Sequence, residues 1–202
     1  MADVKKIESK NFSFTPENLA RAEKIIAKYP VGRQASAVLP LLDMAQRQNG
    51  NWLPQAALDC VADLLEMPHV RVYEVASFYT MFNLKPIGEN FIQICTTSPC
   101  WLRGSDGIVS ACKKKLGVGI GETTGDGKFT LTEVECLGAC VNAPMTQIND
   151  EFYEDLTPEL MEKLIDTLAS GQKPEPGSQT GRRGSCAQNG PTSLKEKAKT
   201  NA

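Results

Sequence analysis

The chain has 202 residues, which is enough for one large domain or two small ones. A hydrophobic content of 41% and a charged content of 23% are typical of a soluble protein. The net charge of −2 argues against general nucleic-acid binding, which requires a basic surface. No apolar run reaches the ~18 residues of a transmembrane helix, and residues 1–10 lack the features of signal and transit peptides. The sequence therefore predicts a cytoplasmic protein that does not insert directly into a membrane.

Residues 12–84 are expected to form a small domain of four helices. The first begins at Thr15, because Thr-Pro-Glu supplies an N-cap, a proline at the first helical position and an acid in the first turn. The second extends over residues 34–48, and the third and fourth follow Pro54 and Pro68. This domain contains no group of ligand-type residues, which indicates a structural or docking role.

Residues 85–171 are expected to form a second domain. It begins with a short buried strand, Phe91–Ile94, which is followed directly by Cys95. Ser98 and the proline after it predict the start of a helix that continues to about Leu116.

A glycine-rich loop over residues 117–128 does not match a P-loop, because its lysine is followed by Phe129. Phe129–Val134 alternates like a half-buried strand. Beyond it the sequence predicts two strands that pair with each other and a final helix, at residues 144–148, 151–153 and 157–171.

The composition changes after Gly171. Residues 172–202 are rich in Pro, Gly, Ser and Gln, with six Lys or Arg against two Glu. Such a segment cannot bury a core of its own, so it is expected to be a disordered tail or to wrap on a partner.

Four of the seven cysteines form two close pairs. Cys95 and Cys100 have C-x4-C spacing, and Cys136 and Cys140, after a gap of 35 residues, have C-x3-C spacing. Four thiolates arranged in this way can bind one [2Fe–2S] cluster or one tetrahedral Zn²⁺, and the spacing alone does not separate the two. Two disulfides are disfavoured in a cytosolic protein. Gly138 is expected to supply an unusual backbone torsion between two ligands.

The remaining cysteines are not expected to be ligands. Cys60 and Cys112 fall in predicted helices and are expected to pack in the core, while Cys186 falls in the tail. The only histidine, His69, excludes a His-rich metal site and weakens any Ser-His or Cys-His catalytic site. No catalytic residue is assigned.

The cysteine motifs carry a family resemblance. The runs Cys95–Asp106 (CTTSPCWLRGSD) and Glu135–Met145 (ECLGACVNAPM) resemble those of the small [2Fe–2S] subunit of the NADH-oxidising module of respiratory complex I. The resemblance covers about residues 12–171. It implies an α/β fold, in which a thioredoxin-like ferredoxin domain is preceded by a small four-helix domain. It also favours iron over zinc, with one [2Fe–2S] cluster bound by Cys95, Cys100, Cys136 and Cys140.

The resemblance also implies a function. The chain would exchange single electrons with the FMN of a flavoprotein partner that binds NADH, as a subunit of NADH:quinone oxidoreductase. FMN and NADH would be bound by the partner and not by this chain. The chain would then belong to the peripheral electron-transfer arm of a complex at the inner membrane, and it would not catalyse a reaction when isolated.

Two alternatives remain at this stage. Related subunits occur in NAD-linked hydrogenases and formate dehydrogenases, and the sequence hardly separates these complexes from complex I. The second alternative is of another class, a zinc-stabilised interaction module without a redox role.

Overall fold

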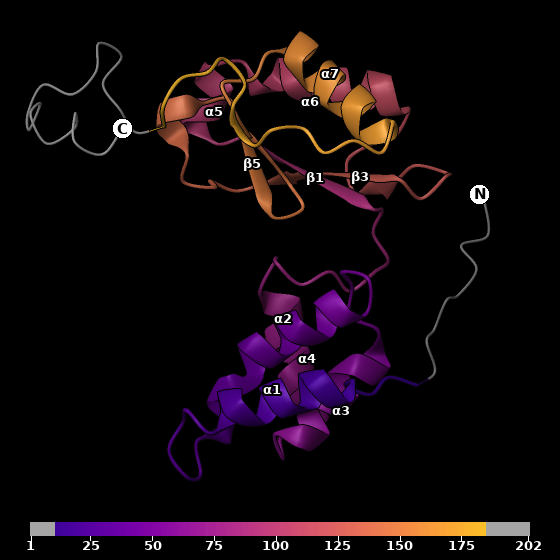
Figure 1. Cartoon of the computed structure of the whole chain (residues 1–202), viewed down its shortest axis with the longest axis vertical. Helices are drawn as coiled ribbons and strands as arrows, with labels where there is room; N and C mark the ends of the chain where they lie inside the picture. The colour runs from indigo at the N-terminus through magenta and orange to yellow at the C-terminus, as the bar shows by residue number, and fades with distance from the viewer. Residues whose placement is uncertain (1–10, 185–202) are drawn as a thin grey trace, which may run out of the picture. The chain divides into compact units, whose positions relative to one another are not determined.

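The computed structural model describes residues 11–184, which divide into two compact units between Ile87 and Gly88 (Figure 1). In its described part, the first unit consists of helices and the second is built around a β-sheet. The predicted class, a helical region followed by an α/β sheet domain, is confirmed.

Residues 11–87 of the first unit form four α-helices and one short 3₁₀ helix. The N-cap prediction is confirmed at Thr15, whose hydroxyl accepts a hydrogen bond of 3.2 Å from the N–H of Asn18. Pro40 lies in the first turn of its α-helix, where a missing N–H leaves no hydrogen bond unmade. The elements are α1 (Pro16–Ile26), η1 (Gln34–Ala37), α2 (Val38–Gln48), α3 (Gln55–Leu64) and α4 (His69–Phe78).

The first unit has its own apolar core. Its fully buried side chains include Leu41 and Leu42 on α2, Val61 on α3 and Val72 on α4. Cys60, on α3, is half-buried beside this core.

The second unit is built on a six-stranded mixed sheet in the order β2-β3-β1-β4-β5-β6. The central strand β1 runs parallel to β3 and antiparallel to β4, and β4 pairs with β5 in an antiparallel hairpin. Helices α6 and α7 pack against each other on one face of the sheet (Figure 1). The strands are β1 (Asn90–Cys95), β2 (Glu122–Thr123), β3 (Phe129–Val134), β4 (Thr146–Ile148), β5 (Glu151–Glu154) and β6 (Gly177–Ser178), and the helices are α5 (Ser98–Leu102), α6 (Ser105–Leu116), η2 (Cys140–Asn142) and α7 (Pro158–Ala169).

The core of the second unit lies between this sheet and the two helices. Ile92, Ile94 and Leu131 from the strands pack with Ile108 and Met161 from the helices, and each is at most 1% exposed. The expected final helix is present as α7, and Thr157 caps it by accepting a hydrogen bond from the N–H of Leu160.

One predicted helix is divided in the structure. The sequence predicts a single helix from Ser98 to about Leu116, but α5 ends at Leu102 and α6 begins at Ser105. Gly104 between them has a φ of 93°, a left-handed conformation that most residues avoid and that ends a right-handed helix. The break separates the short turn that carries Cys100 from the longer helix that covers the sheet.

Gly88 lies where the chain enters the sheet. Its N–H donates a hydrogen bond of 2.6 Å to the Thr130 hydroxyl on β3. A Cβ atom at this position would lie 2.8 Å from the backbone N and C of Phe129, closer than carbon atoms approach without repulsion. Only glycine therefore allows the chain to pass so close to β3.

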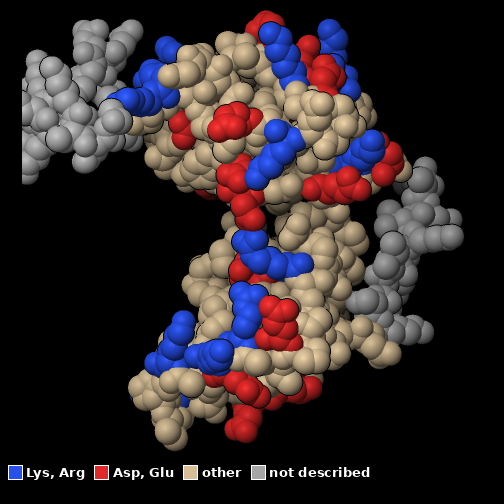
Figure 2. Space-filling model, in the orientation of Figure 1, with Lys and Arg blue, Asp and Glu red and all other residues tan. Residues whose placement is uncertain are grey.

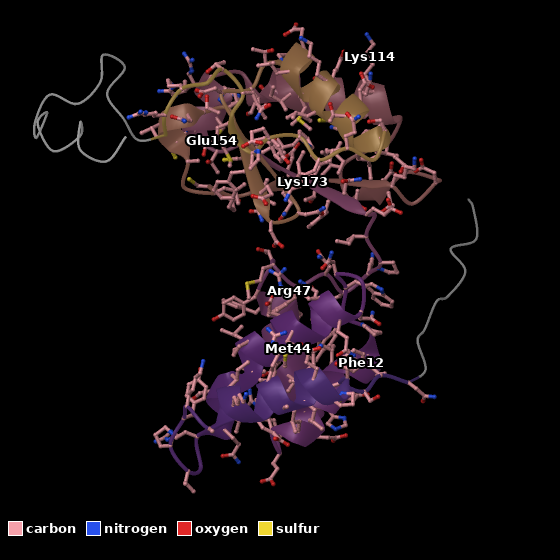
Figure 3. All side chains as sticks on the ribbon, viewed as in Figure 1. Phe12, Met44, Arg47, Lys114, Glu154 and Lys173 are labelled. Carbon is pink, nitrogen blue, oxygen red and sulfur yellow. The ribbon has the colours of Figure 1, made fainter. Side chains whose placement is uncertain are left out.

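Part of the segment predicted as a disordered tail is ordered in the structure. Residues 172–184, which we call the C-terminal strap, contain β6, and β6 pairs in parallel with β5. No residue of the strap is buried, and polar contacts hold it in place. Gln179 donates its N–H to the carbonyl of Glu154 at one end of β5, and Lys173 forms an ion pair of 2.9 Å with Glu151 at the other (Figure 3 labels Glu154 and Lys173). Residues 185–202, with Cys186, lie outside the described part.

Arg182 is the main charged anchor of the strap. Its guanidinium lies 2.6 Å from the Asp155 carboxylate and also donates a hydrogen bond of 2.7 Å to the carbonyl of Val141. Ser178 donates a further hydrogen bond of 2.6 Å to Asp155. Burial opposes ionisation of Asp155, but its bonds with Arg182 and Ser178 outweigh burial and lower its pKa.

We expect Arg182→Gln to release the strap. The amides of Gly177–Ser178 should then exchange hydrogen for deuterium several-fold faster, because their pairing with β5 loses its charged anchor. The matched control is Lys173→Gln, which removes an ion pair at the far end of the same strap between two more exposed groups. Equal exchange rates in Arg182→Gln and wild type would contradict this assignment.

The anchor also has a pH dependence. Since the pKa of Asp155 is lowered in the folded chain, its contribution to stability is complete above the ordinary pKa of about 4 and is lost as the pH falls below that value. Exchange at Gly177–Ser178, corrected for its intrinsic pH dependence, should accelerate in that acidic range.

The surface is mixed in charge. On the face drawn in Figure 2, acidic and basic side chains are interspersed and neither sign forms a continuous field. Among residues 11–184, no helix combines the length and apolar character that a membrane crossing requires.

Candidate metal centre

The two cysteine pairs meet because of the pairing between β1 and β3. Cys95 is the last residue of β1, and Cys136 follows the end of β3 by two residues. The strands are parallel, and Cys95 lies opposite Val134 in the ladder. Since the carboxyl ends of neighbouring parallel strands lie at the same edge of a sheet, the two cysteine motifs lie together there.

The first pair is buried. Cys95 and Cys100 are each 1% exposed and pack with Ala143 and Met145 in a small cluster that is separate from the main core. Cys100 lies on α5, which directly follows β1, and its thiol is near enough to that of Cys95 to affect its ionisation.

The second pair lies at the surface. The sulfur atoms of Cys136 and Cys140 are 3.4 Å apart, and both residues are exposed. Gly138 between them has a φ of 86°, which confirms the torsion expected from the sequence. One pair is thus enclosed by the protein and the other faces outward, a difference that the spacing of the cysteines does not indicate.

The environment favours ionisation of one thiol in each pair. Burial opposes ionisation of Cys95, but hydrogen bonds from Thr97 and from the backbone N–H of Leu137 outweigh it and lower the pKa. A hydrogen bond from the backbone N–H of Gly138, followed by bonds from Cys140 and Thr97, lowers the pKa of Cys136.

The other member of each pair holds its proton more tightly. Burial and the bond with Cys95 raise the pKa of Cys100 to about 12. The hydrogen bond with Cys136 is the main cause that raises the pKa of Cys140. A metal centre would displace the protons of these thiols, because cysteine binds metal as the thiolate.

The arrangement as two pairs bears on the choice between iron and zinc. A tetrahedral Zn²⁺ needs four sulfur atoms that converge on one point at about 2.3 Å. Two adjacent pairs suit a dinuclear cluster held by four thiolates better than a single ion. The donor set therefore fits a [2Fe–2S] cluster.

The remaining cysteines of the described part lie elsewhere. Cys112 is fully buried on α6 in the main core of the second unit, and burial raises the pKa of its thiol to about 12. Cys60 belongs to the first unit. Cys112 thus packs in a different cluster from the buried pair Cys95 and Cys100.

Two residues of the site were missed in the sequence. Thr97 contacts the sulfur of Cys95 through its hydroxyl, and Arg182 of the C-terminal strap reaches the carbonyl of Val141, the residue after Cys140. A threonine in a ligand loop gives no local signal of such a contact, whereas an arginine that interrupts the Pro- and Gly-rich tail was a signal that could have been noticed.

The comparisons with known proteins agree with this donor set. The family described as thioredoxin-like [2Fe–2S] ferredoxin matches residues 22–169, which is most of the chain. The chain belongs to the thioredoxin-like [2Fe–2S] ferredoxin family. This membership confirms the fold expected from the cysteine motifs.

Curated relatives of this ferredoxin identify its closer group. The E subunit of NADH-quinone oxidoreductase from Rickettsia bellii is 66% identical over 158 residues, which are 78% of this chain and 95% of the relative. "NADH dehydrogenase [ubiquinone] flavoprotein 2, mitochondrial" from Dictyostelium discoideum is 55% identical over 185 residues, 92% of this chain and 75% of the relative. Within the ferredoxin family, the chain thus belongs with the E subunits of NADH-quinone oxidoreductase, as the sequence motifs predict.

A solved structure adds evidence on the ferredoxin fold alone. A crystal structure of NAD⁺-reducing [NiFe]-hydrogenase matches with a TM-score of 0.57 at 21% identity, over 64% of this chain and 23% of that chain. At such low identity the likeness does not favour the hydrogenase alternative over complex I.

Proposed function

We propose that this chain is the [2Fe–2S] electron-transfer subunit of an NADH-quinone oxidoreductase and binds one cluster through Cys95, Cys100, Cys136 and Cys140. The observation that carries the proposal is the meeting of two thiol pairs at the carboxyl ends of β1 and β3. The 66% identity to the Rickettsia bellii subunit of NADH-quinone oxidoreductase supports complex I as the parent complex.

When bound, a [2Fe–2S] cluster supplies one-electron redox chemistry and becomes more negative on reduction. The residues of the chain hold and surround it. Cys95 and Cys100 enclose one side within the protein. The backbone N–H groups of Leu137 and Gly138 point at sulfur atoms and favour the thiolate form.

The exposed pair gives the proposed cluster an outward side. Because Cys136 and Cys140 lie at the surface, a partner docked over them would bring its own redox group close to the ligands. We propose that this partner is the NADH-binding flavoprotein subunit, whose FMN exchanges single electrons with the cluster. The chain would thereby join the peripheral arm of the complex at the cytoplasmic face of the inner membrane.

The first test is the metal content of the chain purified without oxygen. We expect about two iron and about two acid-labile sulfide per chain, with the visible absorption of a [2Fe–2S] cluster. Stoichiometric zinc without iron would contradict the proposal and favour the zinc-stabilised interaction module.

The second test separates the relay role from NADH oxidation. The isolated chain should not be reduced by NADH, whereas NADH should reduce its cluster once the flavoprotein subunit is added. Reduction of the isolated chain by NADH would show that the chain has a hydride-accepting site of its own.

A further inference from the structure

Thr97 has an unusual role at the start of α5. It occupies the N-cap position, and its carbonyl accepts the first helical hydrogen bond, 2.9 Å from the N–H of Trp101. A threonine at an N-cap ordinarily also accepts a backbone N–H with its side chain. Here the side chain makes no such bond. By contrast, Thr15 and Thr157 use their hydroxyls to cap α1 and α7.

The Thr97 hydroxyl is directed at the cysteines instead. Its oxygen lies 3.3 Å from the sulfur of Cys95. It also lies close enough to Cys136 to lower the pKa of that thiol. The hydroxyl thus reaches one cysteine of each pair, at the place where the buried pair and the exposed pair meet.

We propose that Thr97 is a positioning and tuning residue of the metal centre, and that its hydroxyl donates a hydrogen bond to a ligating sulfur and raises the reduction potential of the cluster. The inference rests on the ligand assignment proposed above. Once a thiol binds metal it has no proton left to donate, so the hydroxyl is the only possible donor in this contact. Thr97 keeps its proton in both redox states, and the couple takes up one electron.

The direction of the effect follows from electrostatics. A hydrogen bond to sulfur stabilises the more negative, reduced state more than the oxidised state. Hydrogen bonds to the sulfur atoms are among the factors that set the potentials of iron–sulfur clusters. Removal of the Thr97 hydroxyl should therefore lower the reduction potential of the cluster. A change in the packing of residue 97 that keeps the hydroxyl should not lower it.

The test is a reduction-potential titration of the full chain with its cluster, read by electron paramagnetic resonance. Thr97→Val replaces the hydroxyl by a methyl group at nearly constant shape, and Thr97→Ser keeps the hydroxyl. Thr96→Val makes the same chemical change one position earlier in the loop. We expect Thr97→Val to favour the oxidised state about tenfold, which is ~59 mV for a one-electron couple. Thr97→Ser and Thr96→Val should remain near wild type.

A wild-type potential in Thr97→Val, with the cluster intact, would overturn the inference and leave the proposed function standing. If Thr97→Val assembles no cluster, the test passes to Thr97→Ser, which should assemble the cluster with a wild-type reduction potential. A missing cluster or a shifted potential in Thr97→Ser would overturn the inference. A wild-type chain without iron would instead refute the proposed function, so the two failures are distinct.

Discussion

Replacement of any one of Cys95, Cys100, Cys136 or Cys140 by alanine should leave the purified chain with little or no [2Fe–2S] cluster. Alanine supplies no ligand, and the one further cysteine among the described residues of the second unit is buried. That cysteine, Cys112, is enclosed in the helix-covered core on α6. The measurement is iron content and visible absorption of each variant, with electron paramagnetic resonance after reduction.

The matched controls are Cys60→Ala and Cys112→Ala. Both should retain the full cluster spectrum. Cys112→Ala should still lower stability by roughly 1 kcal/mol, because it removes a fully buried side-chain atom from the core. Loss of the cluster in Cys112→Ala, together with an intact cluster in one of the four ligand variants, would refute the ligand assignment.

Gly88→Ala should destabilise the second unit, although it replaces no cysteine. The new Cβ would lie 2.8 Å from the Phe129 backbone, and backbone cannot move aside as the end of a flexible side chain can. To relieve this clash, β1 and β3 would have to move apart at the end of the strands opposite the cysteines. We expect the free energy of the opening that exposes the β1 and β3 amides to exchange to fall by about 1–3 kcal/mol, as at other overpacked sites. Hydrogen exchange of the β1 and β3 amides measures this in the second unit by itself.

Gly125→Ala is the control for this change. A Cβ at Gly125 meets no atom within 4 Å, so the same substitution there should alter stability by no more than about 0.5 kcal/mol. Unchanged protection of β1 and β3 in Gly88→Ala would show that the close approach at Gly88 is relieved at little cost.

The parts of the fold set by short-range chemistry were predictable. Thr15 and Thr157 begin helices as expected, because the cap, the proline and the acid are neighbours in sequence. The β4–β5 hairpin was also expected, because its two strands and the turn between them are neighbours in sequence. The division at Gly104 was missed, since a glycine inside an apolar helical pattern is often tolerated and only its left-handed torsion shows the break.

Features set by distant contacts were not predictable. The strap has the composition of a disordered segment, and its order depends on Asp155 and on the open edge of β5. In the same way, the four cysteines indicated a metal centre, but the burial of Cys95 and Cys100 depends on packing with Ala143 and Met145, which are distant in sequence. Nothing in the sequence indicated that the side chain of Thr97 contacts the sulfur of Cys95 instead of capping its helix.

The parallel pairing of β1 and β3 also has a topological consequence. If Cys95 and Cys140 bind one cluster as proposed, metal–sulfur bonds close residues 95–140 into a ring that contains α5, α6, β2 and β3. The elements β4, β5, α7 and the strap lie outside this ring. A force applied to the two ends of the chain could therefore extend the outer elements but could not lengthen the ring until a metal–sulfur bond broke. The ring also limits the conformations open to the unfolded chain, as a disulfide would, so a bound cluster would stabilise β3 through the unfolded state as well as through its contacts.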